Sequence, residues 1–245
     1  GQNLPGQIGD WGQWQNWRND HIGQVGDWWQ NNWNNFSDWY GDHWWHDHDI
    51  DWPYYPGFGY WAGAAWGAMS NWVDYGWTDP VYYNYGDNVY YDDGSVYYGD
   101  QPVCTELQYI EQAEAIALSE PETKPAANDW MSLGVFAITQ DGEPTGAVPT
   151  MFLQLAVSKQ GGINGTFQNT ATKAVKAIDG MVDKQTQRAA WTVAGESRPL
   201  METGIVNLTQ EATSALIHFP DNSTQRVLLV RLEKPGTTPK ATSTK

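Results

Sequence analysis

From residue 130 to residue 233, apolar and polar side chains alternate along a series of short segments separated by turn-forming clusters. In the second segment, Met151, Leu153, Leu155 and Val157 alternate with more polar neighbours. Alternation with a period of two indicates β-strands that bury one face. Short loops between such strands make neighbouring strands antiparallel. The eight strands expected here span residues 132–140, 150–158, 162–168, 173–182, 188–194, 200–208, 214–219 and 225–233.

Eight antiparallel strands without crossover helices predict a small up-and-down β-barrel. A β-sandwich is the alternative arrangement of the same strands. The TQEATS segment at 209–214, between the sixth and seventh strands, is expected to form one helical turn. We expect the barrel domain to span residues 130–235. A linker with two prolines and mixed charge precedes it at 121–129, and a polar tail follows at 236–245.

Residues 10–45 carry apolar side chains at helical spacing, in steps of three or four residues that would form one stripe along a helix. The same segment contains several Gly, Asn and Asp residues, each of which costs a helix interior roughly 0.5–1 kcal/mol relative to Ala. Such a helix needs a partner surface to form. We therefore expect one or two amphipathic helices here. The stripe comprises Trp11, Trp14, Arg18, Ile22, Val25, Trp29, Trp33, Phe36 and Tyr40.

Between residues 60 and 120 the pattern predicts three further elements. Small residues interleaved with Trp and Met at 60–73 predict a short helix. Val and Tyr residues punctuated by Gly-Asp and Asp-Gly turns predict two tight hairpins from Val81 to Val103. Residues 105–119 predict a helix with Thr105 as its N-cap. The chain as a whole is expected to be α+β, with a partly helical Trp/Asn/Gly-rich region at 1–80 and a Tyr-rich β-meander plus helix at 81–120.

Charge divides the chain sharply. Residues 1–123 hold 19 acidic residues against one basic residue, Arg18, whereas residues 124–245 hold 12 basic and 10 acidic residues. A region with a net charge of −18 repels phosphate backbones, so we exclude nucleic acid as a partner. No apolar run approaches the roughly 18 residues that a membrane span needs, so no membrane-spanning segment is expected.

Patterns typical of catalysis are weak throughout the sequence. There is no G-x-S-x-G motif, and the single cysteine, Cys104, lies at a predicted helix start with no His nearby in the sequence. His218 lies beside Phe219 in an apolar strand, where a His with satisfied hydrogen bonds is expected. We therefore expect the protein not to be an enzyme and to need no cofactor.

The densest group of metal-binding side chains is DHWWHDHDID at residues 42–51. Imidazoles and carboxylates at this density can hold a divalent metal ion. Their spacing matches no established metal-binding motif, so a solvated acidic loop is the alternative. The candidate metal ligands are His43, His46, His48, Asp47 and Asp49.

Fourteen of the 16 tryptophans fall within the first 77 residues. Exposed Trp combines a large apolar face with a hydrogen-bonding edge, which suits protein interfaces and stacking on sugars. Internal packing is the alternative, because this region contains few aliphatic residues to form a core. The candidate interface residues are Trp29, Trp33, Trp44, Trp45, Trp61, Trp66 and Trp72.

The run GWTDPVYYNYGDNVYYDDGSVYYGDQPV at 76–103, followed by DWMSLGVFAITQ and MFLQLAVSKQGGINGTFQNTAT, resembles a family of planctomycete proteins labelled as cell-surface or protocadherin-like. This resemblance implies export and an extracellular or cell-surface location. The chain begins GQNLPG without a signal-peptide pattern, as expected if a leader has been removed. In addition, GGINGTFQN followed by IDGMVDKQTQRAAWTV is loosely similar to avidin-type barrels, which supports the barrel topology and identifies no binding residue.

These observations favour a non-enzymatic cell-surface or extracellular structural protein. We expect it to assemble into a homo-oligomer or polymer, such as a filament, or to mediate adhesion through its acidic aromatic region. The alternative is a binding module that holds a glycan or a small molecule at the barrel mouth or on an exposed Trp/Tyr surface. The most informative single observation is whether the first 80 residues contact their own barrel or a neighbouring copy.

Overall fold

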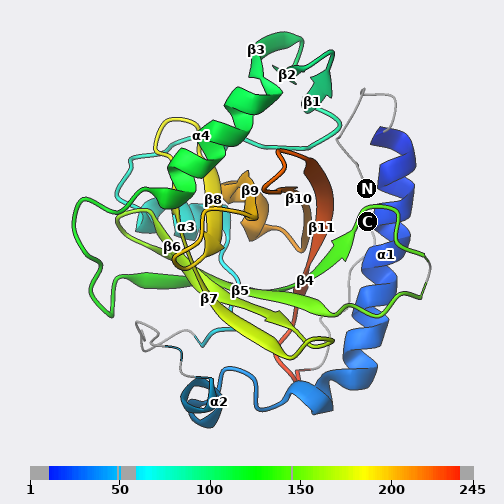
Figure 1. Cartoon of the computed structure of the whole chain (residues 1–245). Helices are drawn as coiled ribbons and strands as arrows, with labels where there is room; N and C mark the ends of the chain where they lie inside the picture. The colour runs from blue at the N-terminus through cyan, green and yellow to red at the C-terminus, as the bar shows by residue number, and fades with distance from the viewer. Residues whose placement is uncertain (1–10, 49, 51–58, 145, 238–245) are drawn as a thin grey trace.

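The structure, a computed structural model in which residues 11–48, 50, 59–144 and 146–237 are described, centres on a closed antiparallel β-barrel (Figure 1). Each strand pairs with the next along the chain, and the last strand pairs with the first from Val227–Gln140 to Leu232–Val135. The predicted α+β class and up-and-down barrel are confirmed, and the β-sandwich alternative is wrong because the sheet closes on itself. The strands are β4 (Trp130–Gln140), β5 (Met151–Ser158), β6 (Gly162–Asn169), β7 (Ala174–Val182), β8 (Arg188–Val193), β9 (Leu200–Gly204), β10 (Ala212–His218) and β11 (Thr224–Leu232).

The predicted alternation along the strands is confirmed, but several strands are buried on both faces. Leu153, Leu155 and Val157 of β5 belong to the core inside the barrel. Phe152 and Ala156, on the opposite face of the same strand, are buried in a second cluster outside the barrel wall. The expectation of one buried face per strand is therefore wrong here, because the N-terminal region covers the outside of the wall.

A 3-10 helix, η3 (Ile205–Thr209), replaces the end of the predicted sixth strand, and the expected helical turn at 209–214 is wrong. The side chain of Asn207 explains the difference. It accepts a hydrogen bond from the amide N of Tyr83 over 3.2 Å, and its amide donates to the carbonyl O of Tyr83 over 3.0 Å. The Asn207 side chain thus pairs with the backbone of Tyr83 as a neighbouring strand would. The apolar residues next to it in η3 are buried.

The N-terminal region forms α1 (Trp11–Asn32), η2 (Trp33–Phe36) and α2 (Asp42–Asp47), with α1 lying along β11 and near β4 in Figure 1. The buried face of α1 includes Trp14, Val25 and Trp29 from the predicted stripe. It also includes His21, which the stripe did not contain and which stacks on Trp17 with ring centroids 4.5 Å apart. The partner surface that this helix needs is therefore the outer wall of its own barrel.

The short helix α3 (Trp66–Trp72) closes one end of the barrel. Met69 is fully buried in the interior cluster, together with Val73 just after the helix. The segment around α3 is fastened to the turns at this end, because the indole N–H of Trp77 donates to the carbonyl O of Lys184 over 2.8 Å. This end of the barrel is filled by protein side chains.

The Tyr-rich meander lies one strand later than predicted, as β1 (Val89–Asp92), β2 (Ser95–Tyr98) and β3 (Gln101–Thr105). The first expected strand, near 81–85, is wrong because its backbone pairs with side chains. The amide N of Val81, for example, donates to Oε1 of Gln187.

The predicted helix is confirmed as α4 (Glu106–Leu118), with Thr105 and Gln108 forming a capping box. It packs across the outside of β7 and β8 (Figure 1).

Residues 121–129 connect α4 to β4 without a helix or strand, as the predicted linker requires. The division into separate domains stays a prediction, since one hydrophobic cluster combines Trp29 and Trp44 with Val135 and Leu228 of the barrel. Within the described residues, no helix combines the length and apolarity needed to cross a membrane.

Candidate functional site

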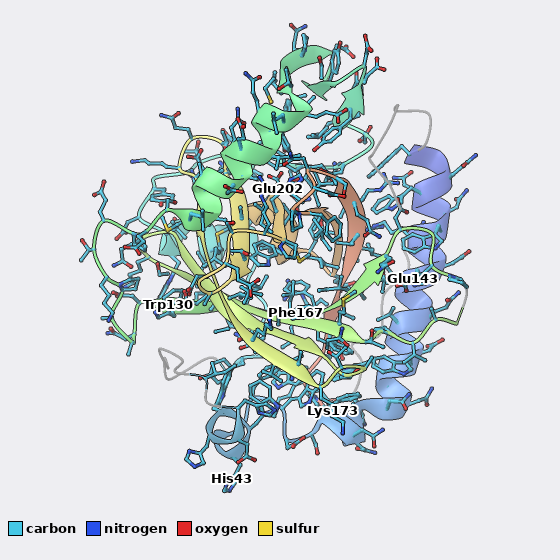
Figure 2. The ribbon with its side chains drawn as sticks, viewed as in Figure 1. His43, Trp130, Glu143, Phe167, Lys173 and Glu202 are labelled. Carbon is cyan, nitrogen blue, oxygen red and sulfur yellow. The ribbon has the colours of Figure 1, made fainter. Side chains whose placement is uncertain are left out.

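A cavity of about 230 Å³ opens at the end of the barrel away from α3. It lies where β4, β6, β8 and β10 end and where β5, β9 and β11 begin, and residues at these strand ends line it. Figure 2 shows Phe167 of β6 within the ring of strands. Eleven of the fourteen lining residues are apolar, and none is charged. They are Ile138, Gln140, Met151, Leu153, Phe167, Ile178, Trp191, Thr192, Val193, Pro199, Met201, Ile217, Phe219 and Gln225.

Trp191 of β8 occupies the interior beside this cavity and is 1% exposed. Gly180 faces it across the β7–β8 pair, where an added Cβ would collide with the backbone of Ala190 and Trp191. The glycine thus allows the backbones of β7 and β8 to approach closely beside Trp191. The indole N–H of Trp191 is buried and has no hydrogen-bond partner among the described residues, a condition that typically costs about 1–3 kcal/mol.

The chemistry of the lining defines what this cavity can hold. Burying a charge without a partner is strongly unfavourable, so the charge-free walls select neutral molecules. Apolar contact stabilises such a molecule by roughly 25 cal/mol for each Å² removed from water. Gln140 is exposed and Gln225 is half-buried at the mouth, so their side-chain amides can hydrogen-bond an uncharged polar group there.

A larger groove of about 880 Å³ lies on the outer wall, between the end of α4, residues 119–125 and strands β6–β8. Asn164, Asp179 and Thr192 lie side by side on its floor. Burial, and then the nearby charge of Glu120, raise the pKa of Asp179. Trp130 at the groove is only 4% exposed, so it presents no open ring face on which a sugar could stack. The groove has hydrogen-bonding groups but lacks the aromatic platform expected for a glycan.

A buried charge network lies on the outer face of the barrel under α4 and the meander, where Figure 2 labels Glu202. Nε of Arg188 donates to Oε2 of Glu202 over 2.8 Å, and Nε2 of His218 lies 2.6 Å from Oε1 of the same carboxylate. Burial would raise the pKa of Glu202, but the Arg188 guanidinium and the hydrogen bond with His218 outweigh burial and lower that pKa. Nδ1 of His218 also lies 2.7 Å from the hydroxyl O of Thr224. The network holds the wall together, and its charged groups are partnered.

The predicted metal ligands His43, His46, Asp47 and His48 are exposed, on or just after α2. Figure 2 shows His43 pointing away from the molecule, and Nδ1 of His48 lies 2.7 Å from the carbonyl O of Trp44. Asp49 lies outside the described residues. No group of three or more His, Cys, Asp or Glu side chains in the described part is arranged to hold a metal ion. Binding of a divalent metal here stays a prediction.

The seven predicted interface tryptophans contact the chain's own barrel or one another. Trp29 and Trp44 are buried against the outer wall. The others are half-buried: Trp33, Trp45 and Trp61 pack against the same outer cluster, and Trp66 and Trp72 against the interior cluster at the closed end. The structure therefore places these side chains in internal packing, and an additional role at an interface stays a prediction.

None of the residues that line the barrel mouth was predicted from the sequence to be a site residue. Met201, Ile217 and Phe219 read simply as strand residues. Only the closed ring brings the ends of these strands together, so a search for inward-facing positions at one end of the predicted barrel would have found them.

No known protein family matches the chain, and comparisons with curated proteins and with solved structures also give no match. The resemblance of residues 76–103 to planctomycete cell-surface proteins therefore stays a prediction.

Proposed function

We propose that the protein is a non-enzymatic binding protein whose barrel mouth takes up a small, neutral, mainly apolar molecule. The observation that carries this proposal is the cavity of about 230 Å³, which is lined almost entirely by apolar side chains and lies at the barrel end opposite α3. This volume lies below the roughly 300–1,000 Å³ of pockets for drug-sized ligands. The proposed ligand is thus small, such as a single fused ring system or a short alkyl chain, with any uncharged polar group at the glutamine rim.

The non-enzymatic part of the proposal rests on the lining itself. The cavity offers apolar side chains, two glutamines and one threonine. The hydroxyl of that threonine, Thr192, already donates to the carbonyl O of Pro199 over 2.8 Å. General acid–base or nucleophilic catalysis needs a titratable or activated group within hydrogen-bond reach of the substrate, and none lines this cavity.

Assembly or adhesion through the N-terminal tryptophans becomes the second candidate. The net charge of −18 over residues 1–123 and the half-buried faces of Trp33 and Trp61 support it. Burial of Trp29 and Trp44 on their own barrel leaves less aromatic surface for a neighbour than the sequence alone indicates. Light scattering of concentrated protein tests this candidate, which requires a mass above that of the monomer. Location at the cell surface is a separate proposal, supported by the resemblance of residues 76–103.

Isothermal titration calorimetry with a matched pair of probes tests the binding proposal. Indole is small, flat and neutral, whereas indole-3-carboxylate adds one negative charge to the same rings. We expect saturable binding of indole and no measurable binding of the carboxylate, because the cavity has no cation to pair with it. Equal binding of both probes would contradict the proposal.

A cavity-filling variant locates the binding. Met201 lines the cavity and points into the barrel, so Met201→Trp fills the space. Val148 is 57% exposed on the β4–β5 loop and does not line the cavity, so Val148→Trp is the matched control. We expect Met201→Trp to abolish indole binding and Val148→Trp to leave it unchanged.

A further inference from the structure

An apolar groove of about 380 Å³ lies between the Tyr-rich meander, α4 and the β7–β8 turn, outside the barrel. Tyr97 and Tyr98 of β2, Val103 and Cys104 of β3 and Thr186 of the turn are among its lining residues. In Figure 1 the meander and the start of α4 project beyond the barrel. This groove and the barrel-mouth cavity both border on β8. Arg188 of β8 lines the groove, and Trp191 of the same strand lines the cavity.

Two of the exposed large hydrophobic side chains, Tyr98 and Val103, line this groove. Among the described residues six such side chains are exposed, and five of these lie between residues 81 and 120. Val103 is 54% exposed and Tyr98 is 38% exposed, and both line the groove. An apolar groove whose lining includes exposed large side chains is typical of an interaction site.

The meander and α4, which form most of the groove, carry charge of one sign, whereas the β7–β8 turn beside it carries the exposed Lys184. Residues 81–120 contain eight acidic residues and no Lys, Arg or His. Asp92, Asp93, Asp100 and Glu111 are exposed. Arg188 at the groove floor does not neutralise these carboxylates, because it already forms an ion pair with Glu202 inside the wall, at 2.8 Å. A partner with basic residues gains attraction here, and an acidic partner is repelled.

Strand addition along the free edge of the meander is disfavoured. In the described structure β3 pairs only with β2, and its central residues include Pro102, which has no N–H to donate to an added strand. A partner would therefore be recognised through its side chains, which enter the groove. The apolar lining from Val89, Val96 and Val103 suits an aliphatic anchor at its centre.

We infer that this groove docks a basic segment of another protein, which inserts an aliphatic side chain between β3 and α4 while its Lys or Arg residues face the surrounding carboxylates. The inference is independent of the barrel-mouth proposal, since the two sites are lined by different residues. The single cysteine allows docking to be detected in the natural chain. Cys104 is half-buried in the groove, so a docked segment shields its thiol.

A fluorescein-labelled peptide built from repeats of Lys-Leu-Ser is the probe, and the same peptide with Glu in place of Lys is its counterpart. We expect fluorescence anisotropy to show saturable binding of the Lys peptide, weakened by added salt, and no binding of the Glu peptide. At saturation the Lys peptide slows the reaction of Cys104 with N-ethylmaleimide.

Two matched variants place the binding on the groove. Val103→Asp puts a charge on the lining, and Val148→Asp puts the same charge on an equally exposed valine elsewhere. We expect Val103→Asp to weaken peptide binding about tenfold or more, as loss of a central anchor does, and Val148→Asp to leave it unchanged. Circular dichroism confirms that both variants fold.

Four results would overturn the inference. They are no binding of the Lys peptide, binding of the Glu peptide with equal affinity, equal weakening by both variants, and an unprotected Cys104 at saturation. Concentration-dependent dimerisation that Val103→Asp abolishes would also overturn it, because the groove would then serve a second copy of this chain.

Discussion

The indole N–H of Trp29 donates a hydrogen bond to the carbonyl O of Glu233 over 2.8 Å, across 204 residues of sequence. Trp29 lies on α1, and Glu233 immediately follows the last barrel strand. The same indole is buried against the outer wall together with Val230 and Leu232. The Trp29 side chain thus holds α1 against the barrel, both by apolar contact and by a hydrogen bond.

Trp29→Phe should destabilise the protein by about 1 kcal/mol, the usual net value of one lost hydrogen bond, while most of the apolar contact remains. Trp29→Ala should cost roughly 3–5 kcal/mol, because it also leaves a cavity. Urea unfolding followed by circular dichroism measures both. Trp33→Phe is the control, since Trp33 is half-buried in the same region and makes no hydrogen bond to a described residue. Equal effects of Trp29→Phe and Trp33→Phe would contradict the assigned role of the hydrogen bond.

Glu202 should make the protein sensitive to acid. Its pKa in the folded state is below the ordinary value of 4.5, so its ionised form contributes stability above that value. This contribution is lost as the pH falls through the lowered pKa. Glu202→Gln removes the contribution at all pH values and leaves Arg188 buried without its charge partner, which should cost roughly 3–5 kcal/mol near neutral pH.

The free energy of unfolding measured between pH 3 and pH 7 tests this prediction. Glu202→Gln should flatten the acid side of the stability profile. Glu196→Gln is the control, because Glu196 is 46% exposed and its pair with Lys176 spans 3.8 Å, so its loss should cost about 0–1 kcal/mol. An acid profile of Glu202→Gln that parallels the natural protein's would disprove the role of this carboxylate.

Gly63 and Arg231 are close enough that any side chain at residue 63 meets the guanidinium. A Cβ on Gly63 would lie 2.5 Å from Nη1 of Arg231. That guanidinium cannot move freely, because it donates to the carbonyl O atoms of Leu133 and Leu208. Burial lowers the pKa of Arg231 to about 10, so the group stays charged at neutral pH and keeps these hydrogen bonds.

Gly63→Ala should therefore destabilise the fold by about 1–3 kcal/mol, as overpacking does. Gly67→Ala is the matched control, since nothing lies within 4 Å of a Cβ at Gly67 and alanine favours its helix α3. Thermal unfolding should show a lower midpoint for the first variant and an equal or higher midpoint for the second. A neutral Gly63→Ala would mean that the Arg231 guanidinium can shift away from residue 63 without loss of stability.

Local patterns were sufficient to predict the barrel and α4. Strand alternation such as Leu153, Leu155 and Val157 fixes which face turns inward, and short turns leave antiparallel neighbours. The Thr105 cap depends only on residues within one helical turn, so it too can be read from sequence. The stripe on α1 correctly indicated a helix that needs a partner surface.

The errors arise where a side chain replaces a backbone partner or where distant segments meet. The IVNL run before Thr209 has strand-like composition, but Asn207 bonds the backbone of Tyr83 and the run becomes η3. Burial of Phe152 depends on α1, more than 100 residues earlier in the chain. The barrel-mouth cavity depends on the gaps left between side chains from eight strands, and no sequence pattern records such gaps.

NMR of methyl-labelled methionine shows whether the barrel mouth holds a small neutral molecule. The chain has five methionines, at residues 69, 131, 151, 181 and 201. Met151 and Met201 line the cavity, whereas Met69 lies at the closed end and Met131 near the start of β4. On titration with indole, we expect saturable shifts of the Met151 and Met201 methyl resonances and little change at Met69 and Met131. Equal shifts at all five, or none at Met151 and Met201, would contradict binding at the barrel mouth.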